Sequence, residues 1–173
     1  MSAVRTGPVT LAEMMAHALA IERAAVERYN ALADVMEVHN NREVTELFRK
    51  MARIETRHVE QIVAQMGWKS AAAAPTPSPW AEVEEFESVP EDQVHYLMWP
   101  WHALKLALAA EQRAEAFYAR VAETAGADAV RRAAIELRDE EREHVALVQQ
   151  WLAQTPPPGA DWADDPDPPR YTD

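Results

Sequence analysis

Two short Glu-x-x-His motifs are the most chemically informative feature of the sequence. They run from Glu55 to His58 and from Glu141 to His144, and each interrupts a series of apolar residues spaced three and four apart. That spacing is typical of the buried face of a helix. A carboxylate and an imidazole three residues apart on one face can bind the same metal ion. Each motif therefore predicts half of a metal site inside a helical core.

Two further glutamates interrupt the apolar faces of two other segments. Glu22 and Glu111 each precede a tyrosine by seven residues, Tyr29 and Tyr118 respectively. Seven residues make two helical turns, and helical side chains lean toward the N-terminus of the helix. We therefore expect each tyrosine to reach back to a carboxylate of the predicted site, where its hydroxyl can orient a metal ligand without binding metal itself.

The predicted site combines four carboxylates and two imidazoles where hydrocarbon is expected. Buried charges persist when they are paired or bind metal, and the sequence offers no matching set of inward-facing Lys or Arg. Two divalent cations would balance four glutamates, which favours two metal ions over one. The candidate ligands are Glu22, Glu55, His58, Glu111, Glu141 and His144.

Four amphipathic segments must position these residues. We predict helices over residues 11–38, 41–66, 100–125 and 128–155. Thr10 and Glu13 form a capping-box pattern before the first helix, Asn40 or Asn41 can cap the second, and Asp128 can cap the fourth. Gly67 ends the second helix, and Pro100 suits the first turn of the third.

The distances along the chain place the ligands in one layer. Glu22 and Glu55 lie at similar distances from the turn that joins their helices, and so do Glu111 and Glu141. Helices of about 26 residues are roughly 39 Å long, a length that the connector over 67–99 can cross. We predict an all-α four-helix bundle over 1–155, in which two antiparallel hairpins are joined by a long crossover. The proline-rich, acidic tail over 156–173 is expected to be irregular.

Composition excludes several classes of function. The net charge of -12 leaves no basic surface for nucleic acid or an anionic membrane. No stretch approaches the ~20 apolar residues of a membrane span, and the N-terminus lacks the pattern of a signal peptide. The absence of cysteine excludes disulfides and thiolate ligands, and it fits a cytoplasmic location.

These residues and spacings resemble the ferritin-like diiron-carboxylate superfamily, and most of all its rubrerythrin-like and bacterioferritin-like members. The resemblance implies that Glu22 and Glu111 are terminal ligands, that Glu55 and Glu141 bridge, and that the histidines complete one ion each. It implies two iron ions that react with O2 or H2O2, with Fe(II) itself as a substrate; manganese and mixed centres use the same ligands. A homodimer is in keeping with this resemblance.

The sequence departs from those relatives in three ways. It has no rubredoxin-like domain with four cysteines, it has Ala25 and Ala114 where rubrerythrins carry an extra carboxylate, and it ends in a tail where many cage-forming ferritins have a fifth helix. The leading hypothesis is a ferroxidase-type or peroxidase-type oxidoreductase. The alternatives are a non-catalytic metal-handling protein and a structural bundle that keeps a relic site.

Overall fold

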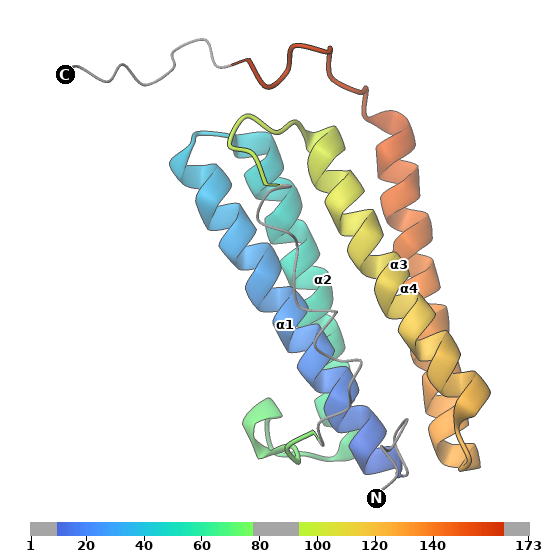
Figure 1. Cartoon of the computed structure of the whole chain (residues 1–173). Coiled ribbons are helices and arrows are strands. Elements are labelled where there is room, and N and C mark those ends of the chain that lie inside the picture. The colour runs from blue at the N-terminus through green and yellow to red at the C-terminus, as the bar shows by residue number, and fades with distance from the viewer. Residues whose placement is uncertain (1–9, 78–93, 165–173) are drawn as a thin grey trace, which may run out of the picture.

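The chain folds into four long antiparallel helices. The computed structural model describes residues 10–77 and 94–164 (Figure 1). Its elements are α1 (Leu11–Val38), α2 (Arg42–Met66), a short 3-10 helix η1 (Ala71–Ala73), α3 (Pro100–Thr124) and α4 (Asp128–Gln154). The part of the chain with described structure contains no strand, so the predicted all-α class is confirmed. None of these helices is long and apolar enough to cross a membrane.

Side-chain caps fix the starts of the first two helices. The backbone N–H of Glu13 donates to the Thr10 hydroxyl, and the backbone N–H of Thr10 donates to the Glu13 carboxylate, both at 3.2 Å. This is the predicted capping box, and it satisfies donors that the first helical turn leaves unpaired. Of the two asparagines considered for α2, Asn41 is the cap, because its side chain accepts from the N–H of Val44.

The predicted cap of α4 is wrong by one residue. Ala127 is the residue at the cap position, and Asp128 is the first residue of the helix. The Asp128 carboxylate instead accepts from Arg131, one turn further along, at 3.1 Å. A carboxylate in the first turn still interacts favourably with the positive end of the helix dipole, so this acidic residue supports the helix without capping it.

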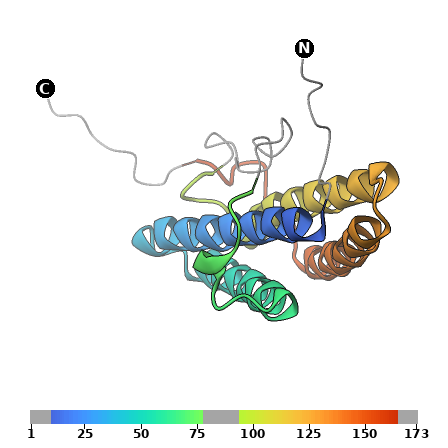
Figure 2. The ribbon, with the colours of Figure 1, turned by 90° about the horizontal axis from the view of Figure 1, so that it is seen from below.

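The connection between the two hairpins begins and ends at opposite ends of the bundle. The α1–α2 hairpin lies beside the α3–α4 hairpin in both views (Figures 1 and 2). α2 ends at the end of the bundle where α1 begins, whereas α3 begins at the opposite end (Figure 1). The predicted topology of two hairpins and a long crossover is confirmed. The predicted crossover and tail lie partly outside the described residues, at 78–93 and 165–173.

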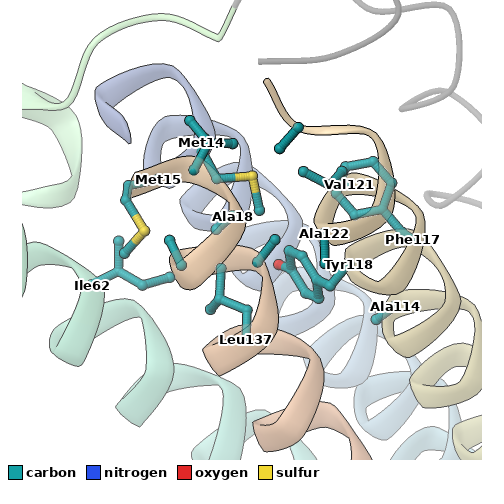
Figure 3. Packing of buried hydrophobic residues seen from close by; sticks show 14 of the residues in the cluster. Met14, Met15, Ala18, Ile62, Ala114, Phe117, Tyr118, Val121, Ala122 and Leu137 are labelled. Carbon is teal, nitrogen blue, oxygen red and sulfur yellow. The ribbon is translucent and has the colours of Figure 1, made fainter. Parts of the chain in front are cut away.

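The apolar core consists of two clusters, one on each side of a polar layer. We name each after its buried tyrosine. The Tyr118 cluster, shown in Figure 3, includes Met14, Met15, Ala18, Ile62, Phe117, Tyr118, Val121 and Leu137. The Tyr29 cluster includes Tyr29, Met36, Phe48, Met51, Leu104 and Val148. On every helix the predicted glutamate lies between residues of the two clusters, so both ends of the bundle are apolar and its middle is charged.

Two glycines offer a matched test of how the helix ends contribute to stability. Gly67 follows α2 with φ of 65°, a left-handed conformation, whereas Gly126, between α3 and α4, has no positive φ. A Cβ would meet nothing within 4 Å at either position. We expect Gly67→Ala to lower the free energy of unfolding by about 1–2 kcal/mol. Gly126→Ala should leave it unchanged or raise it by up to about 1 kcal/mol. Urea denaturation measures both; equal effects of the two substitutions would contradict this account.

Candidate metal centre

The six predicted ligands meet in one layer near the middle of the bundle. Each helix supplies one glutamate, and these side chains are among the most buried in the described structure. Their residues are between 1% and 4% exposed: Glu22, Glu55, Glu111 and Glu141. The side chains of His58 and His144 are 13% and 11% exposed. The layer therefore places four carboxylates and two imidazoles in an environment almost free of water.

The first hairpin forms one half of the layer. The Nδ1 atom of His58 lies 3.6 Å from a carboxylate oxygen of Glu22 and 3.8 Å from one of Glu55. His58 follows Glu55 by one helical turn, and the antiparallel register of α1 and α2 brings Glu22 to the same height. The hairpin thus brings Glu22 and Glu55 close together although they are 33 positions apart in the sequence.

The second hairpin repeats the arrangement. The Nδ1 atom of His144 lies 3.3 Å from an oxygen of Glu111 and 3.6 Å from one of Glu141. The two imidazole rings stack across the interface between the hairpins, with centroids 4.5 Å apart and planes at 18°. The two halves therefore face each other and form one continuous site.

Three overlapping groups of these side chains could each hold a cation, since the ligand atoms within each group lie within 4.8 Å of one another. The groups are Glu55 with His58 and His144; Glu22 with His58 and Glu141; and Glu111 with Glu141 and His144. Glu141 belongs to one group with each histidine, and Glu55 belongs to the group that contains both. The glutamates of the two Glu-x-x-His motifs thus lie between the halves, whereas Glu22 and Glu111 each lie on one side.

The carboxylates interact strongly in the absence of a cation. Burial, followed by the charges of Glu111 and Glu22, raises the pKa of Glu55 well above its ordinary value. Burial likewise raises the pKa of Glu141 well above its ordinary value, although His144 opposes this shift. One oxygen each of Glu22 and Glu55 is buried without a hydrogen-bond partner in the described structure. Unpaired buried carboxylate oxygens are costly, and a bound cation would satisfy them.

The second hairpin compensates part of this repulsion by itself. Burial would lower the pKa of His144, but hydrogen bonds with Glu111 and Glu141 raise it to about 10. The same contact, against the effect of burial, holds the pKa of Glu111 below its ordinary value. His144 and Glu111 thus form an ion pair that keeps one carboxylate deprotonated and ready to bind a cation.

The two tyrosines differ in their contacts. The Tyr29 hydroxyl donates to a carboxylate oxygen of Glu111 at 3.0 Å, so it reaches the opposite hairpin and not Glu22 on its own helix. The Tyr118 hydroxyl is buried and has no hydrogen-bond partner among the described residues. Burial raises the pKa of Tyr118 well above its ordinary value, and the charge of Glu22 adds to that effect. Tyr118 is therefore close to Glu22 without a hydrogen bond to it.

Two small cavities reach the layer, from different faces of the bundle. One, of about 30 Å³, lies between α1 and α3. It is lined by Ile21, Glu22, Ala25, Arg28, Tyr29, Glu55, Ala110, Glu111, Ala114 and Glu141. The other, also about 30 Å³, lies between α2 and α4 and is lined by residues that include His58, Glu136 and Glu140. The layer is thus accessible to small molecules although its carboxylates are buried.

Arg28 and Glu140 are site residues that the apolar periodicity of the sequence does not reveal. Both are off the stripes that mark the core faces, and both reach a cavity because their side chains are long. Burial raises the pKa of Glu140, while His58 opposes that shift. In the sequence, each of these two positions is marked only weakly, as a polar residue that borders an apolar stripe.

The tyrosines provide a paired test of the hydrogen bond to Glu111. In the metal-free protein, Tyr29→Phe should lower the free energy of unfolding by about 1.5–3 kcal/mol, because it removes a buried bond to a charged acceptor. Tyr118→Phe should change it by less than about 0.5 kcal/mol, because the Tyr118 hydroxyl has no partner to lose. Chemical denaturation in the presence of a chelator measures both, and a larger loss for Tyr118→Phe would refute the assignment.

Stability should depend on pH in a direction set by the raised pKa values. A group whose pKa rises on folding stabilises the protein below its unfolded pKa, and that contribution is lost as pH rises through the folded pKa. For Glu55 and Glu141 the loss begins above 4.5, and for His144 it extends from 6.5 to about 10. Each titrating group contributes up to about 1.4 kcal/mol per pH unit.

The urea concentration at the unfolding midpoint of the metal-free protein should therefore decrease as the pH is raised from about 6 to about 9. Saturating divalent metal should remove or reverse this trend. A metal-free midpoint that rises with pH would contradict it.

Comparisons with known proteins agree with this geometry. The model of the rubrerythrin family matches residues 13–152, which include the whole ligand layer. The chain is also similar to an uncharacterised conserved protein from Magnetospirillum magnetotacticum MS-1, whose crystal structure was solved at 2.00 Å resolution. The two share 38% sequence identity over 87% of this chain and 98% of that chain, with a TM-score of 0.69. No curated protein matches the chain. The match over most of its length shows that the chain belongs to the rubrerythrin family.

Proposed function

We propose that the protein is a non-haem diiron oxidoreductase that uses O2 or H2O2, in a ferroxidase-type or peroxidase-type reaction. The observation that carries this proposal is the ligand layer itself. Four almost fully buried carboxylates converge with two imidazoles, one from each hairpin. Two of the carboxylates have an oxygen that lacks a hydrogen-bond partner in the described structure. A pair of divalent cations balances that charge and uses those oxygens.

Each residue has a role that follows from its place in the layer. Glu22 and Glu111 would each bind one ion, with His58 and His144 as the respective nitrogen ligands. Glu55 and Glu141 lie between the halves and would contact both ions. Iron, when bound, would supply one electron per ion to the oxidant; the same oxygen and nitrogen ligands also suit manganese or a mixed pair.

The surrounding residues would prepare the ligands for binding. His144 and Tyr29 both contact Glu111, so this carboxylate is oriented and kept deprotonated. Glu55 and Glu141 have raised pKa values, so they would release protons when cations bind. The two apolar clusters keep bulk water from the layer along the bundle axis, and the cavity between α1 and α3 gives a small oxidant access from the side.

The second candidate function is non-catalytic metal handling, with which the cavity between α2 and α4 is equally compatible. Glu136 and Glu140 line that cavity together with His58, so acidic groups lead from the surface to a ligand. An acidic approach would attract divalent cations, as either a carrier or a ferroxidase requires. Repeated turnover separates the two, since a carrier should stop after one filling of the site.

Anaerobic titration with Fe(II) tests the proposal. We expect two irons per chain, a change in the visible spectrum when O2 or H2O2 is added, and continued oxidation of Fe(II) beyond two equivalents. Glu55→Gln or Glu141→Gln should weaken iron binding about 10-fold to 100-fold or more, because a shared ligand is lost, whereas the exposed Glu123→Gln should have no effect.

Each result has a distinct meaning. One iron or none per chain would overturn the dimetal site. Two irons with no reaction toward either oxidant would overturn the enzymatic function and favour metal handling. The faster of the two oxidants would identify the reaction as ferroxidase-type or peroxidase-type.

A further inference from the structure

The cavity between α1 and α3 combines a cationic wall with an anionic floor. The four carboxylates of the layer form its floor, and Arg28 and Tyr29 form part of its wall. The rest of its lining is small and apolar and comes chiefly from Ala25, Ala110 and Ala114. Alanine at these positions leaves space directly in front of the layer. This cavity therefore offers binding groups of its own in addition to the metal ligands that form its floor.

Arg28 is the unusual member of this lining. Its Nε atom is buried and has no hydrogen-bond partner in the described part of the chain. Buried arginine nitrogens are normally paired, because a buried donor without an acceptor is costly. The charge of Arg28 acts on Tyr29, where it opposes the larger effect of burial on the pKa of the phenol. Arg28 thus brings to the cavity a positive charge and a hydrogen-bond donor that has no acceptor in the described part of the chain.

The charge of the floor decides when the cavity can accept an anion. Without metal, four carboxylates would repel any anion that approaches. With two divalent cations bound, as the proposed function requires, the floor becomes neutral and Arg28 adds one positive charge. The net charge of the floor and Arg28 together is then +1, which favours the binding of one monovalent anion. In this respect the inference rests on the proposed function.

Size and shape narrow the class of anion. The cavity volume is about 30 Å³, and a site needs roughly 10–15 Å³ on this measure to hold one water molecule. Without bound metal this is room for about two to three water molecules, and bound ions would take up part of it, so the cavity suits an anion of no more than about three heavy atoms. The guanidinium fork pairs best with two oxygens in one plane, as in a carboxylate.

We propose that this cavity is a binding site for a small, planar, monovalent oxyanion of the formate type, which Arg28 binds when the metal layer is filled. The anion would occupy the same space through which a small oxidant reaches the layer. Arg28 would therefore determine which small molecules compete for access to the site.

Formate titration of the Co(II)-loaded full-length protein tests this proposal. Co(II) reports ligand binding through its visible bands and needs no redox step, so the result does not depend on catalytic activity. We expect saturable spectral changes with formate, none in the metal-free protein by calorimetry, and at least tenfold weaker binding of acetate and propionate. Arg28→Gln should raise the formate Kd about tenfold or more, because a charged hydrogen bond is lost. Arg28→Lys should have an intermediate effect.

Two further variants control for indirect effects. Arg113 is a half-buried arginine on α3 whose Nε also lacks a partner among the described residues, but it does not line this cavity. Arg113→Gln should leave the formate Kd unchanged. Ala25→Leu should fill the cavity and abolish formate binding while two Co(II) ions still bind per chain.

The outcomes separate this inference from the proposed function. Fewer than two metals per chain would overturn both. Two metals without a formate response would overturn the anion site alone. Formate binding that is unaffected by Arg28→Gln would overturn the role of Arg28, and with it the proposal. Propionate binding as tight as that of formate would overturn the size limit, and with it the proposal.

Discussion

Mutual repulsion among four buried carboxylates is the constraint on which the rest of this structure depends. Each helix contributes one of these groups, and none of them reaches bulk water. Burying an uncompensated charge costs several kcal/mol, so such a layer persists only with a strong source of opposing charge. Within the described residues, His144 provides part of it, and burial together with the neighbouring carboxylates still raises the pKa values of Glu55 and Glu141.

The fold concentrates that cost in one place and isolates it. The Tyr118 cluster and the Tyr29 cluster enclose the layer from both ends, so the apolar burial that stabilises the bundle is separated from the charge that opposes it. A short turn joins the two helices of each hairpin, and in the first hairpin the Asn41 side chain caps the start of α2. A shift of one residue in either hairpin would rotate a glutamate off the layer. The Asn41 cap in the turn of the first hairpin thus serves the site as well as the helix.

Much of this architecture could be predicted from the sequence because its signals are local. Apolar periodicity and helix-end residues placed both ends of α1 and the end of α2 correctly, and the polar residues that interrupt the apolar faces predicted which six side chains meet. Signals that depend on three-dimensional contacts could not be predicted in the same way. Tyr29 binds Glu111 across the hairpin interface, and helical spacing predicted a contact with the layer without saying which carboxylate. Arg28 reaches a cavity through the length of its side chain, and Asp128 pairs with Arg131 in place of capping α4.

The interleaving of the ligands between hairpins has a mechanical consequence. Two of the three groups that could hold a cation combine residues of α4 with residues of the first hairpin. An ion in either group would join two parts of the chain that are otherwise linked covalently only through the crossover. It would act as a crosslink between the hairpins that exists only in the folded chain, so its binding free energy would add to the stability of the fold. The chain has no cysteine, so metal would take the place of covalent crosslinks.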